Sequence, residues 1–219
     1  DLTPDRIELI KLASSLHDIG KIAIDDKVLN KPGRLTDEEF ELMKQHTVIG
    51  SEMLDNLSYS RKDEPLIEVA YQICRWHHER YDGRGYPDGL KGDEIPIAAQ
   101  VVALADVYDA LTSPRVYKEA FSHEKSIEMI LNGECGSFNP LLLDCLNKVA
   151  DEIQDFLANS SYEKSTDKEV RRIIEDILGN ESSLLVRRSQ ELLDFERMKY
   201  QFFASMSHEL QFEYMVETR

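Results

Sequence analysis

The chain has 219 residues, enough for one domain of ordinary size and an appendage. Hydrophobic residues make up 42% and charged residues 31% of it, which is typical of a globular protein that closes a core. The formal net charge of −16 argues against binding to duplex nucleic acid, because such binding needs a basic face that displaces counterions.

Helical patterns dominate the first half of the chain. Thr3 and Pro4 predict an N-cap and a first helical residue, and an apolar face then continues to Gly20 through Leu9, Leu12, Ala13 and Leu16. Thr36 and Glu39 predict a capping box for a second helix, whose expected buried stripe is Phe40, Met43, Met53, Leu54 and Leu57. A third helix is predicted over residues 65–79, with an inward face of Ile67, Ala70, Ile73 and Cys74.

A glycine-rich loop over residues 82–92 separates these helices from the next group. The following helix begins near Pro96 and is apolar almost all round through Ala105, so we expect it to be central. Two more helices are predicted over residues 124–132 and 141–157. Strand patterns are nearly absent, and the predicted fold class is therefore all-α.

The character of the chain changes after this bundle. Residues 158–168 are polar and favour a linker, and two helical segments then flank Gly179 and Asn180. The last segment, about 181–210, has a weak coiled-coil pattern. We divide the chain into a domain over residues 1–158, a linker with a short helix over 159–180, and a connector helix over 181–219 that leads towards a truncated downstream module.

Cysteine usage and hydropathy indicate the compartment. The three cysteines form no CxxC pair and their odd number argues against a disulfide framework, which favours a reducing environment. The most apolar stretch, residues 95–105, is too short to span a bilayer. We therefore expect a cytoplasmic chain without a membrane span.

Histidines and acids gather on or beside the predicted inward faces. The set comprises His17, Asp18, His46, His77, His78 and Asp106. Taken singly, an inward histidine is more often a hydrogen-bonded core residue. Together they would leave many polar groups to satisfy without a cation, and imidazole with carboxylate suits zinc, iron or manganese. The set predicts a centre for more than one metal ion.

Three sequence blocks carry a family resemblance. "HDIGK" at 17–21, "HHERYDGRGYPDGL" at 77–90 and "DVYDALTSPRVYK" at 106–118 resemble the signature blocks of the HD-GYP family. "KPGRLTDEEFELMKQH" and "GDEIPIAAQVVALADVYDALT" resemble its connecting segments, so the likeness extends over about residues 5–146. The family is helical, has an HD-domain-like bundle, holds two or three metal ions, and hydrolyses the bacterial second messenger cyclic di-GMP to pGpG or GMP.

The resemblance implies a role for each matching residue. His17 and Asp18 become the metal-binding doublet with Asp18 bridging, His46, His77 and His78 ligate a second ion, and Asp106 ligates from the other side. Lys21 meets the scissile phosphate and, with Asp18, is the predicted catalytic pair. The substrate is bound by Gly85, Tyr86 and Pro87 beside it, and by Arg115 and Lys118 at the far phosphate. The expected cofactors are two or more divalent transition-metal ions, iron or manganese first, with zinc, nickel or magnesium as alternatives.

The chain departs from the family pattern in two places. Family members carry an upstream helix that adds a histidine, and in some a glutamate, to the cluster, and no such residues precede His17 here. We therefore expect uneven metal occupancy, low activity, and an apolar groove beside Leu9, Leu12 and Leu16. Asn139 replaces the aspartate usual in its segment, a change expected to be mild.

The C-terminal segment has a resemblance of its own. "FFASMSHEL" at 202–210 is superficially similar to the phosphoacceptor box of histidine kinases, but Gln211 and Phe212 follow where that family has an Arg-Thr-Pro-like segment. The alternation after Gln211 is more typical of the first strand of a PAS-type sensory domain. We interpret the segment as a connector helix, able to support a homodimer and joined to other domains of a longer signalling protein.

Two alternatives to cyclic di-GMP hydrolysis stay open at this point. A degenerate domain would bind the nucleotide or a partner protein without turnover, and another enzyme of the same class would hydrolyse a mixed cyclic dinucleotide. The ligand blocks and Lys21 favour an enzyme. The Gly85-Tyr86-Pro87 loop favours a cyclic dinucleotide but does not specify its bases.

Overall fold

The computed structural model describes residues 3–57, 64–113, 119–159, 172–174, 176–177 and 206. Within these ranges the chain is helical and has no strand, which confirms the all-α prediction. The elements in chain order are α1 (Pro4–Ser14), η1 (Ile19–Ala23), α2 (Asp26–Leu29), α3 (Asp37–Asp55), α4 (Pro65–Trp76), η2 (Gly92–Glu94), α5 (Ile97–Thr112), α6 (His123–Leu131) and α7 (Pro140–Asn159).

The predicted helix starts are confirmed by their caps. The Thr3 hydroxyl accepts the Arg6 amide and Pro4 is the first helical residue of α1. At α3 the Thr36 hydroxyl accepts the Glu39 amide while the Glu39 carboxylate accepts the Thr36 amide. These bonds satisfy backbone donors that have no partner inside the helix, and they fix where each helix begins.

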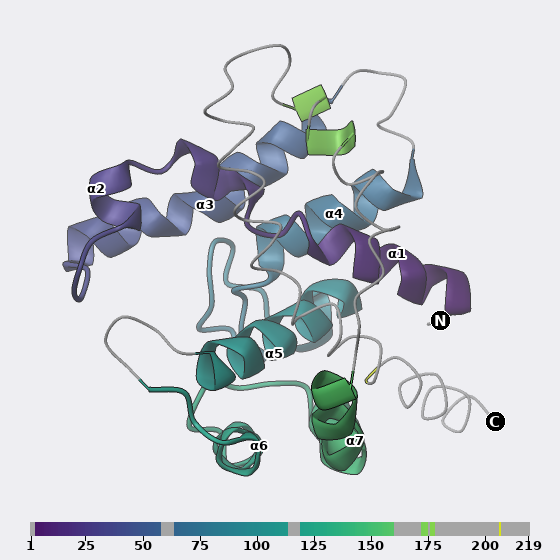
Figure 1. Ribbon diagram of the computed structural model, residues 1–219. Coiled ribbons are helices and arrows are strands. Elements are labelled where there is room, and N and C mark those ends of the chain that lie inside the picture. The colour runs from purple at the N-terminus through teal and green to yellow at the C-terminus, as the bar shows by residue number, and fades with distance from the viewer. Residues whose placement is uncertain are drawn as a thin grey trace.

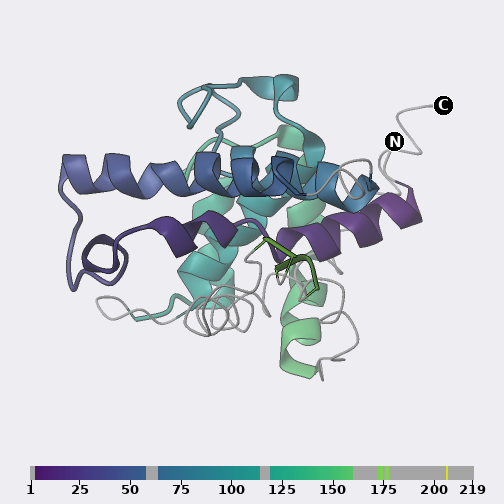
Figure 2. The ribbon, with the colours of Figure 1, turned by 90° about the horizontal axis from the view of Figure 1, so that it is seen from above.

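The helices form one packed body around α5. Figure 1 shows α5 between α4 on one side and α6 and α7 on the other, and α5 packs against both α4 and α6. Its buried residues lie all round the helix and include Ala98, Val102, Leu104 and Ala105, so its predicted central position is confirmed. From above, α3 extends alongside α1 and η1, and η1 packs against α3 (Figure 2).

The first predicted helix is shorter than expected. α1 ends at Ser14. Before η1 begins, backbone amides bond to the carbonyl three residues earlier, as His17 N–H does to Ser14 O at 3.1 Å. His17 and Asp18 therefore lie in a turn rather than at a helix end. The buried face of α1 is Ile7, Ile10, Ala13 and Ser14, while Leu9 and Leu12 are only partly buried.

Three other expectations also need correction. Phe40 was expected in the buried stripe of α3 but is 44% exposed, because it lies in the first turn of α3, beyond the part that packs on the core. The helix that was expected to be apolar through Ala105 does not end there: α5 continues to Thr112, because its apolar pattern resumes after Asp106, and this acid lies inside the helix. α4 ends at Trp76, and His77 is its C-cap.

Two glycines allow η1 to approach α3 closely. A Cβ on Gly20 would lie 2.0 Å from the His46 carbonyl oxygen and 2.6 Å from the Gly50 nitrogen. A Cβ on Gly50 would lie 2.4 Å from the Cys74 sulfur. The absence of both side chains brings the turn after α1 against α3, and this contact positions Asp18 beside His46.

The C-terminal third is described only in part. Ile173 and Met206 are fully buried in the hydrophobic core, with Ile174 nearly so. The predicted linker at 158–168 begins too early, because α7 continues to Asn159. Its remainder and nearly all of the predicted connector helix, including His208, lie outside the described residues. Among the described helices, none is both long and apolar enough to cross a membrane.

Candidate metal centre

Five of the six predicted ligands converge from three parts of the fold. His17 and Asp18 come from the turn before η1, His46 from α3, and His77 and His78 from the end of α4. Two overlapping groups each place their ligand atoms within 4.8 Å of one another, His46 with His77 and His78, and His17 with Asp18 and His77. His77 belongs to both groups.

Backbone carbonyls orient three of the imidazoles. His17 Nδ1 lies 2.8 Å from Ser14 O, His46 Nδ1 lies 2.7 Å from Met43 O, and His77 Nδ1 lies 3.0 Å from Ile73 O. A carbonyl oxygen only accepts, so each Nδ1 donates a proton and each neutral ring presents its Nε2 lone pair. This arrangement orients metal-ligating histidines in proteins generally.

The Nε2 atoms face one carboxylate. His17 Nε2 lies 3.1 Å from Asp18 Oδ2, while His46 Nε2 and His77 Nε2 lie 3.3 Å and 3.8 Å from Asp18 Oδ1. The two Nε2 atoms of His46 and His77 are themselves 3.4 Å apart. The side chains of His17, Asp18, His46 and His77 are buried, and that of His78 is partly buried.

Burial favours the neutral form of three histidines, His46, His77 and His78. It lowers the pKa of His46 and His77, the latter well below the ordinary value, and lowers the pKa of His78 to about 3. Burial opposes ionisation of Asp18, but the neighbouring His17 and Lys21 hold the pKa of its carboxyl well below the usual range. At neutral pH the cluster therefore combines the neutral imidazoles of His46, His77 and His78 with the ionised carboxylate of Asp18.

This combination fits a bound cation. Asp18 Oδ1 is buried and accepts no hydrogen bond from any described residue. The Nε2 lone pairs of His46 and His77 face this oxygen, so three acceptor atoms of the described residues meet in one buried space. A buried acceptor left in this way is costly, whereas a divalent metal ion would be coordinated by all of them. The described residues thus form a cluster suited to metal binding.

Lys21 joins the cluster from η1. Its ammonium group donates to Asp18 Oδ2 at 2.5 Å, and its side chain remains about a quarter exposed. Asp18 Oδ1 therefore faces two imidazoles, while Asp18 Oδ2 faces both His17 Nε2 and the ammonium group of Lys21. This places a cation at the edge of the cluster, within reach of solvent.

The loop after α4 lies against the cluster because of Gly85. A Cβ there would lie 2.4 Å from Arg80 N and from the Glu79 Cα, so only glycine allows this approach. The Tyr86 amide donates to the His78 carbonyl, 3.2 Å, and the Tyr86 and His78 rings are 4.9 Å apart at 31°. The Tyr86–Pro87 peptide bond is cis. The predicted Gly85-Tyr86-Pro87 segment therefore borders the histidines.

Two acids hold this loop in place, and sequence reasoning missed both. The buried Glu79 accepts the amides of Asp88 and Gly89 at 2.7 Å and 2.9 Å. Asp88 in turn accepts two bonds from Arg75 and one from the Trp76 indole. The acid that directly follows the histidine pair was a usable signal for Glu79, because a charged residue beside two inward ligands needs partners of its own.

Asp106 lies near the cluster but in neither ligand group. Its charge raises the pKa of His78 against the larger effect of burial, and it adds to the burial that raises the pKa of Tyr86. Arg115 and Lys118, expected at the far phosphate, lie outside the described residues.

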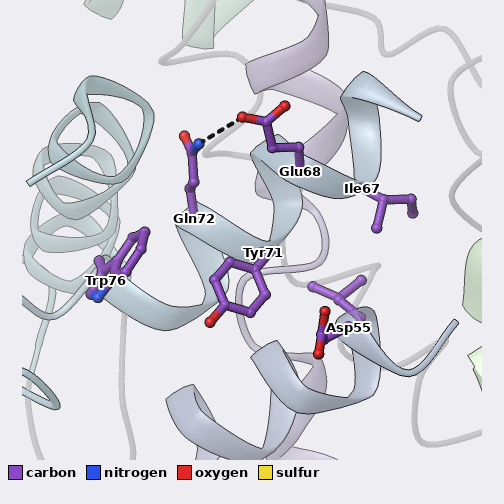
Figure 3. Close-up of a pocket in the computed structure, with 7 residues that line it drawn as sticks. Asp55, Ile67, Glu68, Tyr71, Gln72 and Trp76 are labelled. Carbon is purple, nitrogen blue, oxygen red and sulfur yellow. Dashed lines mark hydrogen bonds between the residues drawn. The ribbon is translucent and has the colours of Figure 1, made fainter. Parts of the chain in front are cut away.

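The cavity of about 330 Å³ between α3 and α4 is a different place (Figure 3). It is lined by Leu54, Asp55, Ile67, Glu68, Tyr71, Gln72 and Trp76, and none of the six predicted ligands borders it. The buried acceptors and the predicted ligands converge instead at the histidine cluster.

Comparison with known proteins identifies the family of this chain. Residues 1–138 match the model of the HD domain family. A cyclic di-GMP phosphodiesterase of Vibrio cholerae serotype O1 is 45% identical over 151 residues, which are 69% of this chain and 31% of that protein. The cyclic di-GMP phosphodiesterase response regulator RpfG of Xanthomonas campestris pv. campestris is 46% identical over 145 residues, 66% of this chain and 37% of that protein.

A relative with another printed substrate matches the same region. The 3'3'-cGAMP-specific phosphodiesterase 2 of Vibrio cholerae serotype O1 is 40% identical over 151 residues, 69% of this chain and 28% of that protein. The chain thus spans about a third of the length of the curated relatives it matches.

Proposed function

We propose that this chain, which belongs to the HD domain family and carries the HD-GYP signature blocks, is a metal-dependent phosphodiesterase that hydrolyses cyclic di-GMP to pGpG or GMP. The observation that carries the proposal is the meeting of Asp18 Oδ1 with His46 Nε2 and His77 Nε2 in a buried space where Asp18 Oδ1 accepts no hydrogen bond from any described residue. The names of the relatives support the reaction class and the cyclic dinucleotide substrate.

The two ligand groups give the residues distinct roles. His46, His77 and His78 would hold one ion, and His17, Asp18 and His77 another. The family resemblance adds Asp106 as a further ligand of the ion beside His17. Iron or manganese suits this mixture of imidazole and carboxylate. When bound, two neighbouring divalent ions lower the pKa of water and neutralise phosphoryl oxygens.

Lys21 acts on the substrate in this proposal. Its ammonium group is held beside the cluster by Asp18 and is partly exposed, so a phosphate oxygen entering from solvent would meet it. A cation there stabilises negative charge, and its proton can pass to the leaving oxygen. Gly85, Tyr86 and Pro87 would form the wall beside the substrate, and Arg115 and Lys118 would bind the far phosphate.

Two rival functions make different predictions. A binding module without turnover would retain cyclic di-GMP but release no product. A phosphodiesterase for the mixed dinucleotide 3'3'-cGAMP is favoured by the 40% identical relative with that printed specificity. Both use the same cluster, so product analysis rather than metal analysis separates them.

The test is a product assay with matched variants. The chain is purified anaerobically, loaded with Mn²⁺ or Fe²⁺, and incubated with cyclic di-GMP or 3'3'-cGAMP before chromatography. We expect pGpG or GMP from cyclic di-GMP, no product after Asp18→Asn, and normal turnover in the exposed control Leu42→Ala. Binding without product in the loaded parent would refute the proposed activity.

A further inference from the structure

A row of rings leads from the histidine cluster to the surface. The His77 and His78 rings are 4.0 Å apart, Tyr86 follows at 4.9 Å from His78, and Phe40 follows at 6.2 Å from Tyr86 in an edge-on contact. Lys44, one helical turn after Phe40, places its ammonium group 4.9 Å from the Phe40 ring centre and 5.5 Å from that of Tyr86. We call Phe40, Lys44 and Tyr86 the aromatic ledge.

The exposure of Phe40 is informative because of its neighbours. A single exposed apolar side chain is ordinary on a protein surface, and Leu42 on the same helix is exposed to 54%. Phe40, however, is held against Tyr86, whose own ring packs on the predicted ligand His78. Phe40 is thus 44% exposed and at the same time in edge-on contact with a ring that borders the cluster.

We propose that the aromatic ledge binds a purine base of the substrate, with Phe40 as the stacking surface and Lys44 as the donor that favours guanine. This inference rests on the proposed function and names the residues that recognise the base. In a cyclic dinucleotide each base is one ribose away from a phosphate. A phosphate at the cluster thus places a base near the rings bordering it.

Phe40 provides affinity in this arrangement. An aromatic side chain that stacks a base contributes about 1–3 kcal/mol to binding, for any base, because every base has a π-face. Phe40 lies in the first turn of α3, which is fixed by its capping box, so its ring is positioned before the ligand arrives. Little ordering is needed on binding, and this favours affinity.

Lys44 provides selectivity. Guanine presents two acceptors on one edge, N7 and O6, whereas adenine presents one acceptor and one donor there. An ammonium group only donates, so it matches the guanine edge better. Lys44 also pairs with Glu41 at 2.6 Å, but the Glu41 side chain is 67% exposed. Such a surface pair is weak, and a base can replace it.

The test measures binding apart from turnover. Calorimetry of the metal-loaded full chain would use the hydrolysis-resistant bis-phosphorothioate analogues of cyclic di-GMP and cyclic di-AMP. The variants are Phe40→Ala, Phe40→Trp, Lys44→Met and the matched control Leu42→Ala. Thermal unfolding of each variant checks that the fold persists, which is expected since all three positions lie at the surface.

We expect Phe40→Ala to raise the Kd for both analogues by roughly 5- to 100-fold, as loss of stacking predicts, and Phe40→Trp to retain parent affinity. Lys44→Met should lower the ratio of affinities for the guanine and adenine analogues by about fivefold or more. Leu42→Ala should bind like the parent.

Each contrary outcome has a separate meaning. Parent-like Kd values in Phe40→Ala would overturn the stacking role while the proposed phosphodiesterase stands. An unchanged guanine-to-adenine ratio in Lys44→Met would overturn the selectivity. A parent chain that binds neither analogue would overturn both the ledge and the proposed function.

Discussion

Adding one methyl group at Gly20 should move Asp18 away from His46. In Gly20→Ala the new Cβ would meet the His46 carbonyl oxygen at 2.0 Å and the Gly50 nitrogen at 2.6 Å. Both neighbours are backbone atoms of α3, so neither can rotate away as a side chain could. The turn that carries Asp18 must then move away from His46.

The cost follows from this geometry. Overpacking a close-packed site lowers the free energy of unfolding by about 1–3 kcal/mol, and rigid backbone neighbours favour the upper end of this range. In a chain of this size each kcal/mol lowers Tm by about 2–4 °C, so we expect a fall of roughly 6–12 °C. Because Asp18 Oδ1 and His46 Nε2 are only 3.3 Å apart, metal affinity should fall as well.

The assay combines thermal unfolding with metal analysis. Ala23→Ser, at an exposed position of the same η1 turn, is the matched control and should leave both readouts unchanged. If Gly20→Ala kept the parent Tm and the parent metal content, the close contact of η1 with α3 would not be what positions Asp18.

Three further predictions follow from single contacts. Lys21→Ala should keep its metal and lose turnover by about 10²- to 10⁴-fold. Metal analysis and product release measure the two effects, and loss of the metal would mean that Lys21 supports metal binding rather than acting on the substrate. Burial lowers the pKa of His78 from 6.5 to about 3. Below pH 6.5, His78 is therefore protonated in the unfolded chain but stays neutral in the folded chain. The metal-free chain should therefore lose roughly 1 kcal/mol through this residue between about pH 7 and pH 5.5, and urea unfolding of His78→Gln in a chelator should show a correspondingly flatter pH dependence; equal slopes would contradict this. Asn139→Asp should lower the free energy of unfolding by less than about 1 kcal/mol, because the hydrogen bond from the Asn139 side-chain amide to Gln100 Oε1 is lost while a negative charge is gained at the start of α7. A loss above roughly 2 kcal/mol in urea unfolding would show that the amide donor matters more than the charge.

The helices could be predicted because their signals are local. The Thr36–Glu39 capping box and the all-round apolar pattern before Asp106 each depend on neighbouring residues, and both are confirmed. The end of α1 depends instead on how the turn after Ser14 packs against α3. That contact involves Gly20 and Gly50, which are 30 positions apart, and no local pattern predicts it.

The metal cluster could be predicted from the sequence for another reason. Histidine and aspartate on inward faces need partners, and this need can be recognised in the sequence for His46 and His77. The orientation of each ring could not be predicted, because it depends on backbone carbonyls such as Met43 O and Ile73 O. The position of Phe40 also escaped prediction, since an apolar residue in an apolar stripe gives no sign that it will be exposed.

Metal stoichiometry tests the central claim most directly, because His77 belongs to both ligand groups. The measurement is the number of Mn²⁺ or Fe²⁺ ions per chain after anaerobic loading, in the parent, His77→Ala and His78→Ala. The account predicts at least two ions in the parent, loss of both in His77→Ala, and retention of the ion held by His17 and Asp18 in His78→Ala. A parent chain that binds no metal, or a His77→Ala variant with the parent's full complement, would contradict it.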